Sequence, residues 1–224
     1  MKILIIEDEQ QLAADMGEYL SSEDYLCEFA SDFDQALEKI ALYVYDCILL
    51  DLMLPGGDGL RILEELKKHN HQQGVIIISA KNAYEDKIEG LQQGADDYLS
   101  KPFHLPELAA SIFSVIRRRN FGNNNIVAHH EIRVDMLAKT VTVNAALVVL
   151  TKKEFDLLLY FMGNINRVVS KSALAEHLSG DIADMFDNHD FVYAHVKNLK
   201  RKLSDAGYGN YLKNVYGTGY KWEA

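Results

Sequence analysis

Charged and polar side chains follow four apolar runs in the first half of the sequence. Glu7 and Asp8 come directly after one run, Asp51 follows a second, and Lys101 lies just beyond a third. Ser79 closes the fourth run. Because strand ends of a parallel sheet converge on one edge, we expect these side chains to lie together. Three carboxylates, a hydroxyl and an ammonium group at one place could hold a divalent cation and accept a phosphoryl group.

Mg²⁺ suits this group of side chains because it prefers oxygen ligands, needs few of them from the protein and keeps several waters. Carboxylates that lie this close repel one another unless a cation neutralises them. We expect the three carboxylates and the backbone carbonyl of Met53 to bind the ion, and one carboxylate to act as a nucleophile toward phosphorus. Lys101 would pair with the phosphoryl oxygens, and Ser79 would donate a hydrogen bond to one of them. Each residue taken singly also fits a structural role, such as a helix cap, so the inference rests on the joint pattern.

The elements that would position these side chains alternate along the first 119 residues. Apolar runs predict strands near residues 2–6, 25–30, 46–50, 74–79 and 96–99. Helical periodicity follows each run, near residues 9–21, 32–43, 58–69, 84–93 and 104–119. Five such units predict an α/β domain: a doubly wound, five-stranded parallel sheet with helices on both faces.

The pattern changes after a short polar segment, residues 120–125, which we interpret as a linker. Short strands are predicted at 131–134, 140–143 and 146–149, and helices near 152–162, 171–178 and 190–205. Thr151 and Glu154 have the spacing of a capping box at the start of the first of these helices. A glycine-containing hairpin over 211–222 closes the chain. The sequence therefore predicts an α/β domain at 1–119 and a second, α+β domain at 126–224.

Charge is distributed unevenly between the two halves. The whole chain carries a formal net charge of −10, with 11 Lys+Arg against 22 Asp+Glu in residues 1–119 and 12 against 11 in residues 120–224. Only the second half is therefore a candidate for binding nucleic acid. The chain has no run of the ~18 apolar residues that a membrane helix needs, and its first residues lead straight into a strand pattern. We expect a cytoplasmic protein with no membrane partner, and its two cysteines as reduced, buried thiols.

The predicted helix at 190–205 carries two distinct faces. Its apolar residues fall at helical spacing and predict a buried stripe, formed by Val192, Val196, Leu199 and Leu203. A second face gathers a tyrosine and basic residues, namely Tyr193, Lys197, Lys200 and Arg201, with Lys202 beside them. Such clustering suits a helix that enters the major groove of double-stranded DNA and contacts phosphates and base edges. Taken alone, it would equally fit the solvated face of a surface helix.

Four segments of the first half occur in a fixed order: IIEDE at 5–9, LDLMLPGGDG at 50–59, ISA at 78–80 and GADDYLSKPF at 94–103. Together they resemble the receiver domain of two-component response regulators, over residues 1–119. The site that this resemblance implies comprises Asp51 as phospho-acceptor, Glu7 and Asp8 as Mg²⁺ ligands, Ser79 as switch hydroxyl and Lys101 as phosphate-sensing cation. It also implies Tyr98 as an aromatic switch that swings inward, a cis peptide before Pro102, and a sensor histidine kinase as phosphoryl donor.

The second half resembles the winged-helix effector domain of the OmpR/PhoB subfamily, over residues 126–223. The segments that carry the likeness are 150–158, 167–171, 195–203 and 215–222. The resemblance implies a four-stranded antiparallel platform, a helix-turn-helix and a C-terminal hairpin wing that enters the minor groove. The expected DNA contacts are Tyr193, Lys197, Lys200, Arg201, Lys202, Tyr216 and Thr218. Residues 190–191, Tyr193 and Tyr216 depart from the subfamily pattern, so the base sequence that is read does not transfer.

In this subfamily the fourth helix, fifth strand and fifth helix of the receiver form a symmetric homodimer through charge pairs between subunits. The matching positions in this chain are Lys87, Glu107, Asp96, Asp97 and Arg118. Ser111 stands where the subfamily usually has an arginine, which would leave Asp97 without its usual partner. Weaker pairing, or more reliance on apolar contacts such as Ile88, is then expected.

The combined reading is a phosphorylation-controlled transcription regulator that binds tandem DNA half-sites about one helical turn apart. Residues 180–188 either contact RNA polymerase, as the equivalent loop does in relatives, or serve only as a connector. Two alternatives stay open: a DNA-binding regulator that works without phosphorylation, and an aspartyl-phosphate phosphatase. We expect no enzyme activity beyond phosphoryl acceptance and slow dephosphorylation at Asp51.

Overall fold

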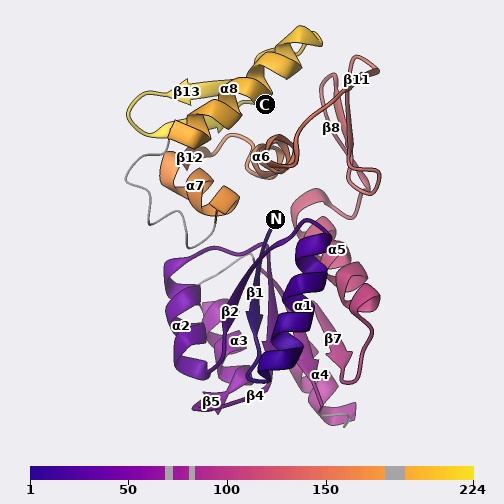
Figure 1. Ribbon diagram of the computed structural model, residues 1–224, viewed down its shortest axis with the longest axis vertical. Helices are drawn as coiled ribbons and strands as arrows, with labels where there is room; N and C mark the ends of the chain where they lie inside the picture. The colour runs from indigo at the N-terminus through magenta and orange to yellow at the C-terminus, as the bar shows by residue number, and fades with distance from the viewer. Residues whose placement is uncertain (69–72, 81–83, 180–189) are drawn as a thin grey trace. The chain divides into compact units, whose positions relative to one another are not determined.

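The computed structural model describes residues 1–68, 73–80, 84–179 and 190–224 (Figure 1). The chain divides into two compact units, Met1–Asn123 and Asn124–Ala224. Among the described residues, none of the helices has the length and apolar character that crossing a membrane requires.

The first unit is built on a five-stranded parallel sheet of order β2-β1-β3-β6-β7. Its strands are β1 (Lys2–Ile6), β2 (Leu26–Ala30), β3 (Cys47–Asp51), β6 (Gly74–Ser79) and β7 (Asp97–Ser100). Every residue of the three central strands β1, β3 and β6 is buried. These strands read as continuous apolar runs because helices cover both faces of the sheet.

Five helices connect the strands: α1 (Gln10–Ser22), α2 (Phe33–Leu42), α3 (Gly59–Lys68), α4 (Tyr84–Gln92) and α5 (Leu105–Phe121). The apolar stripes of α1 and α5 share one core with one face of the sheet. Those of α2 and α3 share a second core with the other face, and α4 approaches the same face through Gly90, which lies against Ile77. The strand order reverses between β1 and β3, which is where a doubly wound sheet opens a binding crevice.

Two local features of this unit were not predicted. A short hairpin of β4 (Met53–Leu54) and β5 (Gly57–Asp58) follows β3; the sequence indicated only a chain break at this place, where Gly56 adopts a φ of 88°. Helix α5 also continues to Phe121, two residues into the expected linker. It ends where Gly122 takes a left-handed conformation and its N–H bonds to the Arg117 carbonyl, which is a standard helix C-cap.

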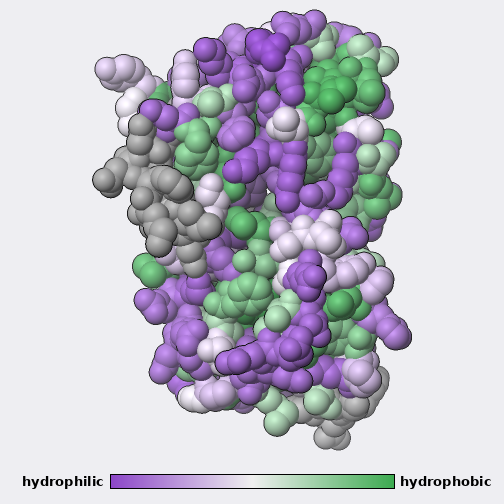
Figure 2. Space-filling view, viewed as in Figure 1, coloured by the Kyte–Doolittle hydropathy of each residue, from purple (hydrophilic) through white to green (hydrophobic). Residues whose placement is uncertain are grey.

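The second unit begins with an antiparallel sheet of order β11-β10-β9-β8. Its strands are β8 (Ile126–His129), β9 (Ile132–Asp135), β10 (Thr140–Val143) and β11 (Ala146–Val148). In Figure 2 hydrophobic side chains gather over this sheet, and the exposed residues Leu137, Leu147 and Val149 belong to its strands and the segments next to them.

Three helices follow, α6 (Lys152–Gly163), α7 (Lys171–Ser179) and α8 (Asp190–Asp205). The predicted capping box at the start of α6 is confirmed, because Thr151 accepts from the Glu154 N–H and Glu154 accepts from the Thr151 N–H. A second sheet of order β12-β14-β13 completes the unit, from β12 (Val168–Ser170), β13 (Leu212–Val215) and β14 (Gly219–Trp222). The two helices α7 and α8 and the β13–β14 hairpin have the arrangement of a winged helix-turn-helix.

Strand β12 is the main element that the sequence did not predict. It has three residues and pairs with β14, with Val169 opposite Tyr220. The close approach depends on Gly219, where an added Cβ would lie 2.0 Å from the Val169 carbonyl oxygen. A three-residue strand is too short to show a periodic pattern in the sequence, and β12 is stabilised by pairing with β14 near the end of the chain.

Candidate functional site

An acidic cluster lies at the carboxyl ends of β1 and β3. Glu7, Asp8 and Asp51 each offer a carboxylate oxygen, and these oxygens all lie within 4.8 Å of one another. Glu7 and Asp51 are buried, with 3% and 5% of their surface exposed, while Asp8 is exposed. The strand register explains why they converge. Ile6 pairs with Leu50, and the next residues along these two strands are Glu7 and Asp51.

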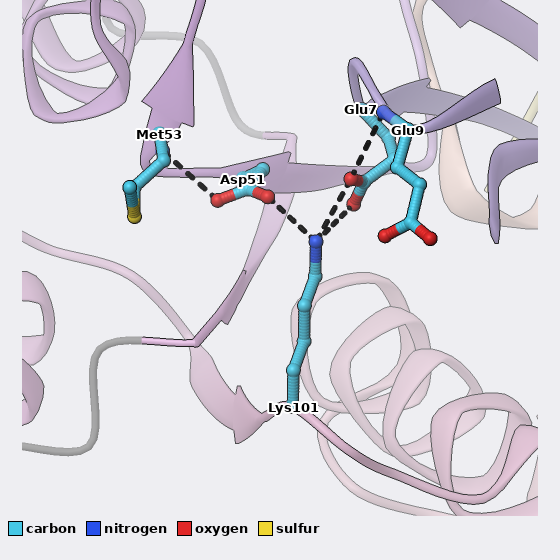
Figure 3. Close-up of polar contacts among 5 residues, drawn as sticks. All are labelled: Glu7, Glu9, Asp51, Met53 and Lys101. Atoms are coloured by element: carbon cyan, nitrogen blue, oxygen red, sulfur yellow. Dashed lines mark hydrogen bonds and ion pairs between the residues drawn. The ribbon is translucent and has the colours of Figure 1, made fainter.

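Lys101 extends from the end of β7 into this cluster (Figure 3). Its Nζ lies 2.6 Å from Asp51 Oδ2 and 2.8 and 2.7 Å from the two carboxylate oxygens of Glu7. Asp51 is held from the other side as well, because its Oδ1 accepts a hydrogen bond of 2.9 Å from the Met53 N–H. The expected cis peptide between Lys101 and Pro102 is present. The carbonyl oxygen of Met53 stays a predicted metal ligand.

The charges in this cluster do not balance among the described side chains. Burial raises the pKa of Glu7, and the hydrogen bonds from Lys101 offset only part of that effect. Burial acts to lower the pKa of Lys101, but its hydrogen bonds to Asp51 and Glu7 together raise it. With all groups ionised, three carboxylates face one ammonium, which leaves two negative charges. Oxygen ligands in this number, with this deficit of charge, fit Mg²⁺.

The two expected switch residues lie in the sheet next to this cluster. Ser79 ends β6 and is fully buried; the residue before it, Ile78, pairs with Asp51 across the sheet. The backbone carbonyl of Ser79 accepts a hydrogen bond of 2.9 Å from the Lys101 N–H. Tyr98 on β7 is only 4% exposed, so its ring lies inside the unit. The Nζ of Lys87 lies 5.9 Å from the centre of that ring.

The residues expected at the dimer face lie on α4, on and just before β7, and on α5, and three of them have partners within their own unit: Asp96, Asp97 and Arg118. Asp96 accepts from the Val75 N–H at 2.9 Å and pairs with Arg119 Nε at 2.7 Å. Arg118 donates to the Asp96 carbonyl at 3.3 Å. Asp97 accepts from the Tyr98 N–H.

Two further members of this face, Lys87 and Glu107, are exposed, as are Ile88 and Leu91 at 37% and 39%. Their place on α4 and in the first turn of α5 leaves both charges available to solvent.

Helix α8 presents its two faces as the sequence predicted. Val192, Val196, Leu199 and Leu203 are buried. On the open face Tyr193, Lys197 and Arg201 are exposed and Lys200 is half-buried. At the tip of the wing, Tyr216 and Thr218 are both exposed, in the turn between β13 and β14.

Lys202 differs from the other basic residues of α8. Its Nζ lies 2.7 Å from the buried carboxylate of Glu154 and donates to the Val149 carbonyl at 3.0 Å. Glu154 is 3% exposed and belongs to α6. The Lys202 ammonium is therefore engaged inside the unit. Helical spacing could not indicate this, because the partner lies 48 residues earlier in the chain.

Two lysines of the wing were not among the predicted DNA contacts. Lys213 on β13 lies directly opposite Lys221 on β14. Directly opposed residues share one face of a sheet, and two like charges in that place repel. Burial lowers the pKa of Lys200, and the nearby charge of Lys213 lowers it further. The equal spacing of the two lysines from Gly217 in the turn was the signal that could have found this pair.

Comparison with known proteins agrees with this architecture. The family model described as response regulator receiver domain matches residues 3–113, and that described as transcriptional regulatory protein, C terminal, matches residues 145–222. The response regulator ArlR of Staphylococcus aureus (strain Mu50 / ATCC 700699) is 37% identical over 219 residues, which cover 98% of each chain.

Solved structures match about half of the chain. The Francisella response regulator 1452 receiver domain is 37% identical, with a TM-score of 0.51 over 52% of this chain and 97% of that chain. A two-component response regulator from Clostridium difficile is 28% identical, with a TM-score of 0.51 over 54% of this chain and 98% of that chain.

The chain belongs to the two-component response regulators of the OmpR/PhoB type, in which a receiver domain precedes a winged-helix DNA-binding domain. It is accordingly a transcription factor of that family.

Proposed function

We propose that a sensor histidine kinase phosphorylates Asp51 and that the phosphoryl group controls dimerisation and DNA binding. The contact of Lys101 with both Asp51 and Glu7 is the observation that best supports this proposal. A cation that touches the acceptor carboxylate is in place to hold phosphoryl oxygens, and the Met53 N–H fixes the orientation of that carboxylate.

The transfer itself exchanges one bond for another. A carboxylate oxygen of Asp51 forms a bond to phosphorus while the bond from phosphorus to the kinase imidazole breaks, and the imidazole leaves with the electron pair. Glu7, Asp8 and Asp51 would hold Mg²⁺, which would neutralise the charge that the carboxylates and the phosphoryl group bring together. Lys101 then has phosphoryl oxygens as alternative partners to its present carboxylates. We assign no further enzyme activity to this site.

The new negative charge changes what Ser79 and Lys101 prefer to contact. Ser79 can donate its hydroxyl hydrogen to a phosphoryl oxygen, and the adjoining face of α4, β7 and α5 then favours pairing with a second copy. Exposed charge pairs such as Lys87 with Glu107 contribute only about 0.2–1 kcal/mol each. Ser111 stands where the subfamily usually has the arginine that pairs with Asp97, and Asp96 is engaged within its own unit. Apolar contacts from α4 therefore contribute a larger share of the stability of the dimer.

For DNA, we propose that α8 lies in the major groove and that the wing contacts the neighbouring minor groove. The exposed residues of α8 are Tyr193, Lys197, Lys200 and Arg201, and those of the wing are Tyr216 and Thr218. We add Lys213 as a phosphate contact, because an anion beside it would relieve its repulsion with Lys221. Lys202 is reassigned to a structural role. A dimer would bind tandem DNA half-sites. We propose that the protein acts in the cytoplasm.

The proposed contact with RNA polymerase falls on residues 180–188, which lie outside the described residues. It remains a prediction from the family resemblance.

One observation favours a second candidate, a regulator that binds DNA without phosphorylation. Tyr98 is buried, and this is the inward position that the resemblance associates with activation. Loading Asp51 with beryllofluoride, a phosphoryl analogue, distinguishes the two. The main proposal expects a rise in both dimer fraction and DNA affinity, measured by sedimentation and fluorescence anisotropy. Equal values with and without the analogue would favour the second candidate, and steady hydrolysis of a phosphomonoester would favour a phosphatase.

A further inference from the structure

A side-chain hydrogen bond joins the two sheets of the winged-helix unit. Trp222 on β14 donates its indole N–H to His129 Nδ1 at 3.3 Å, and His129 is the last residue of β8. Strands β8 and β14 belong to different sheets, the four-stranded sheet and the wing sheet. Trp222 is fully buried and His129 is half-buried. The indole N–H is therefore cut off from solvent and depends on this acceptor.

Aromatic rings surround this bond. The His129 ring meets Tyr211 edge-on at 5.2 Å and Trp222 at 5.8 Å between ring centres. The His130 ring stacks on Tyr211 at 4.6 Å, and Tyr208 lies 5.9 Å from Trp222. The bond is thus embedded in a packed cluster that links β8 to β14 and to the segment just before β13.

The bond exists in only one protonation state of His129. An indole nitrogen can donate but not accept, and an imidazole nitrogen accepts only when it lacks a proton. Neutral His129 with its proton on Nε2 satisfies Trp222. The imidazolium ion carries a proton on both nitrogens, so Nδ1–H would then face the indole N–H and two donors would oppose each other.

The charged groups around His129 are two neighbours on its own segment. His130 lies with its ring 4.4 Å from that of His129, and a positive charge there opposes protonation of His129. Glu131 favours protonation, but it accepts hydrogen bonds from the Tyr211 hydroxyl at 2.9 Å and from the Gly209 N–H at 2.5 Å. On the facing elements, Trp222 of β14 and Tyr211, which precedes β13, present neutral rings.

We propose that His129 and Trp222 form a pH-sensitive latch between the platform sheet and the wing. Protonation of His129 removes the acceptor of the indole N–H and loosens the β13–β14 hairpin from β8. Burial and the charge of His130 lower the pKa of His129 below its ordinary value of 6.5. The folded unit thus favours the neutral form: the contribution of the latch to stability is complete above about pH 6.5 and declines as the pH falls through the folded pKa.

The latch has its own spectroscopic reporter, because Trp222 is the only tryptophan of the chain. In the full-length protein, Trp emission and the indole N–H resonance are followed as the pH falls from about 8 to about 5. We expect one transition with a midpoint below the ordinary histidine pKa, in which emission falls because imidazolium quenches the adjacent indole and the N–H resonance shifts as its bond is lost.

Two variants assign the transition. His129→Gln keeps an acceptor but cannot protonate, so its transition should be absent. His130→Gln leaves the acceptor intact and removes the opposing charge, so its transition should persist with a higher midpoint. An unchanged transition in His129→Gln, or the absence of any transition in the wild-type indole resonance, would overturn the proposal. None of these readouts involves DNA or phosphorylation, so failure of the latch and failure of the proposed function are separate results.

Discussion

The contact between Lys202 and Glu154 makes the sharpest prediction about the winged-helix unit. Replacing Lys202 with Met keeps the aliphatic stem and removes the ammonium. The buried Glu154 carboxylate then loses its partner at 2.7 Å, and the Val149 carbonyl loses a donor at 3.0 Å. Glu154 keeps one hydrogen bond of 2.7 Å, from the Thr151 N–H. In the variant, the Glu154 carboxylate, on a residue that is 3% exposed, therefore keeps the Thr151 hydrogen bond and loses the one from Lys202.

The magnitude follows from these contacts. A hydrogen bond to a charged group contributes about 1.5–3 kcal/mol, and removing one partner of a fully buried pair costs about 3–5 kcal/mol. The side chain of Lys202 is 25% exposed, so water can reach part of the vacated space. We therefore expect a loss of about 2–3 kcal/mol in the free energy of unfolding, equivalent to a fall of roughly 10–20 °C in Tm for a unit of this size.

Urea unfolding followed by Trp222 emission measures this loss in the full-length chain, because the only tryptophan reports on the winged-helix unit. Arg201→Met is the matched control, since Arg201 is exposed and, among the described residues, pairs with the exposed Asp205; its expected change is within about 0.5 kcal/mol. An equal, small change in both variants would refute the structural role of Lys202. Reduced DNA affinity of Lys202→Met at full stability would restore it as a DNA contact.

The same pair predicts a pH dependence. Burial acts to raise the pKa of Glu154, but its bonds to Lys202 and the Thr151 N–H together lower it. A carboxyl group with a lowered folded pKa adds stability above its ordinary value of 4.5, and this stability is lost as the pH falls through the folded pKa. The difference between wild type and Lys202→Met should therefore shrink in acid.

Two other predictions concern the wing and the DNA interface. Gly219→Ala places a Cβ 2.0 Å from the Val169 carbonyl, so it should cost at least about 1–3 kcal/mol by urea unfolding; Gly217→Ala, whose Cβ would have nothing within 4 Å, should cost about 1 kcal/mol or less, from its positive φ alone. The double variant Lys200→Ala/Arg201→Ala should weaken DNA binding and reduce the slope of log affinity against log salt by about 0.9 for each lost phosphate contact. An unchanged slope would contradict the placement of these residues at the interface.

The proposed phosphorylation site was largely predictable because it depends on strand ends. Glu7 and Asp51 each follow an uninterrupted apolar run, and parallel strands next to each other bring such positions together. Even the approach of Lys101 follows from the order of β7 in the sheet. What the sequence could not provide is the exposure of each group: Asp8 faces solvent while Glu7 is buried.

Contacts between distant elements were less predictable. Periodicity placed the cations of α8 on an open face, but Lys202 turns to Glu154, whose position depends on how α6 packs against α8. Arg118 and Arg119 are adjacent in sequence, and only the rotation of α5 decides that Arg119 reaches the Asp96 carboxylate. Strand β12 likewise depends on a partner at the far end of its unit.

The central claim is that Asp51 is the single side chain that accepts a phosphoryl group. The most direct measurement is the intact mass of the full-length protein after incubation with acetyl phosphate and Mg²⁺, for wild type and for Asp51→Asn. The account predicts one acid-stable, base-labile phosphoryl adduct on the wild type and none on the variant. No adduct on the wild type, or the same adduct on Asp51→Asn, would contradict it.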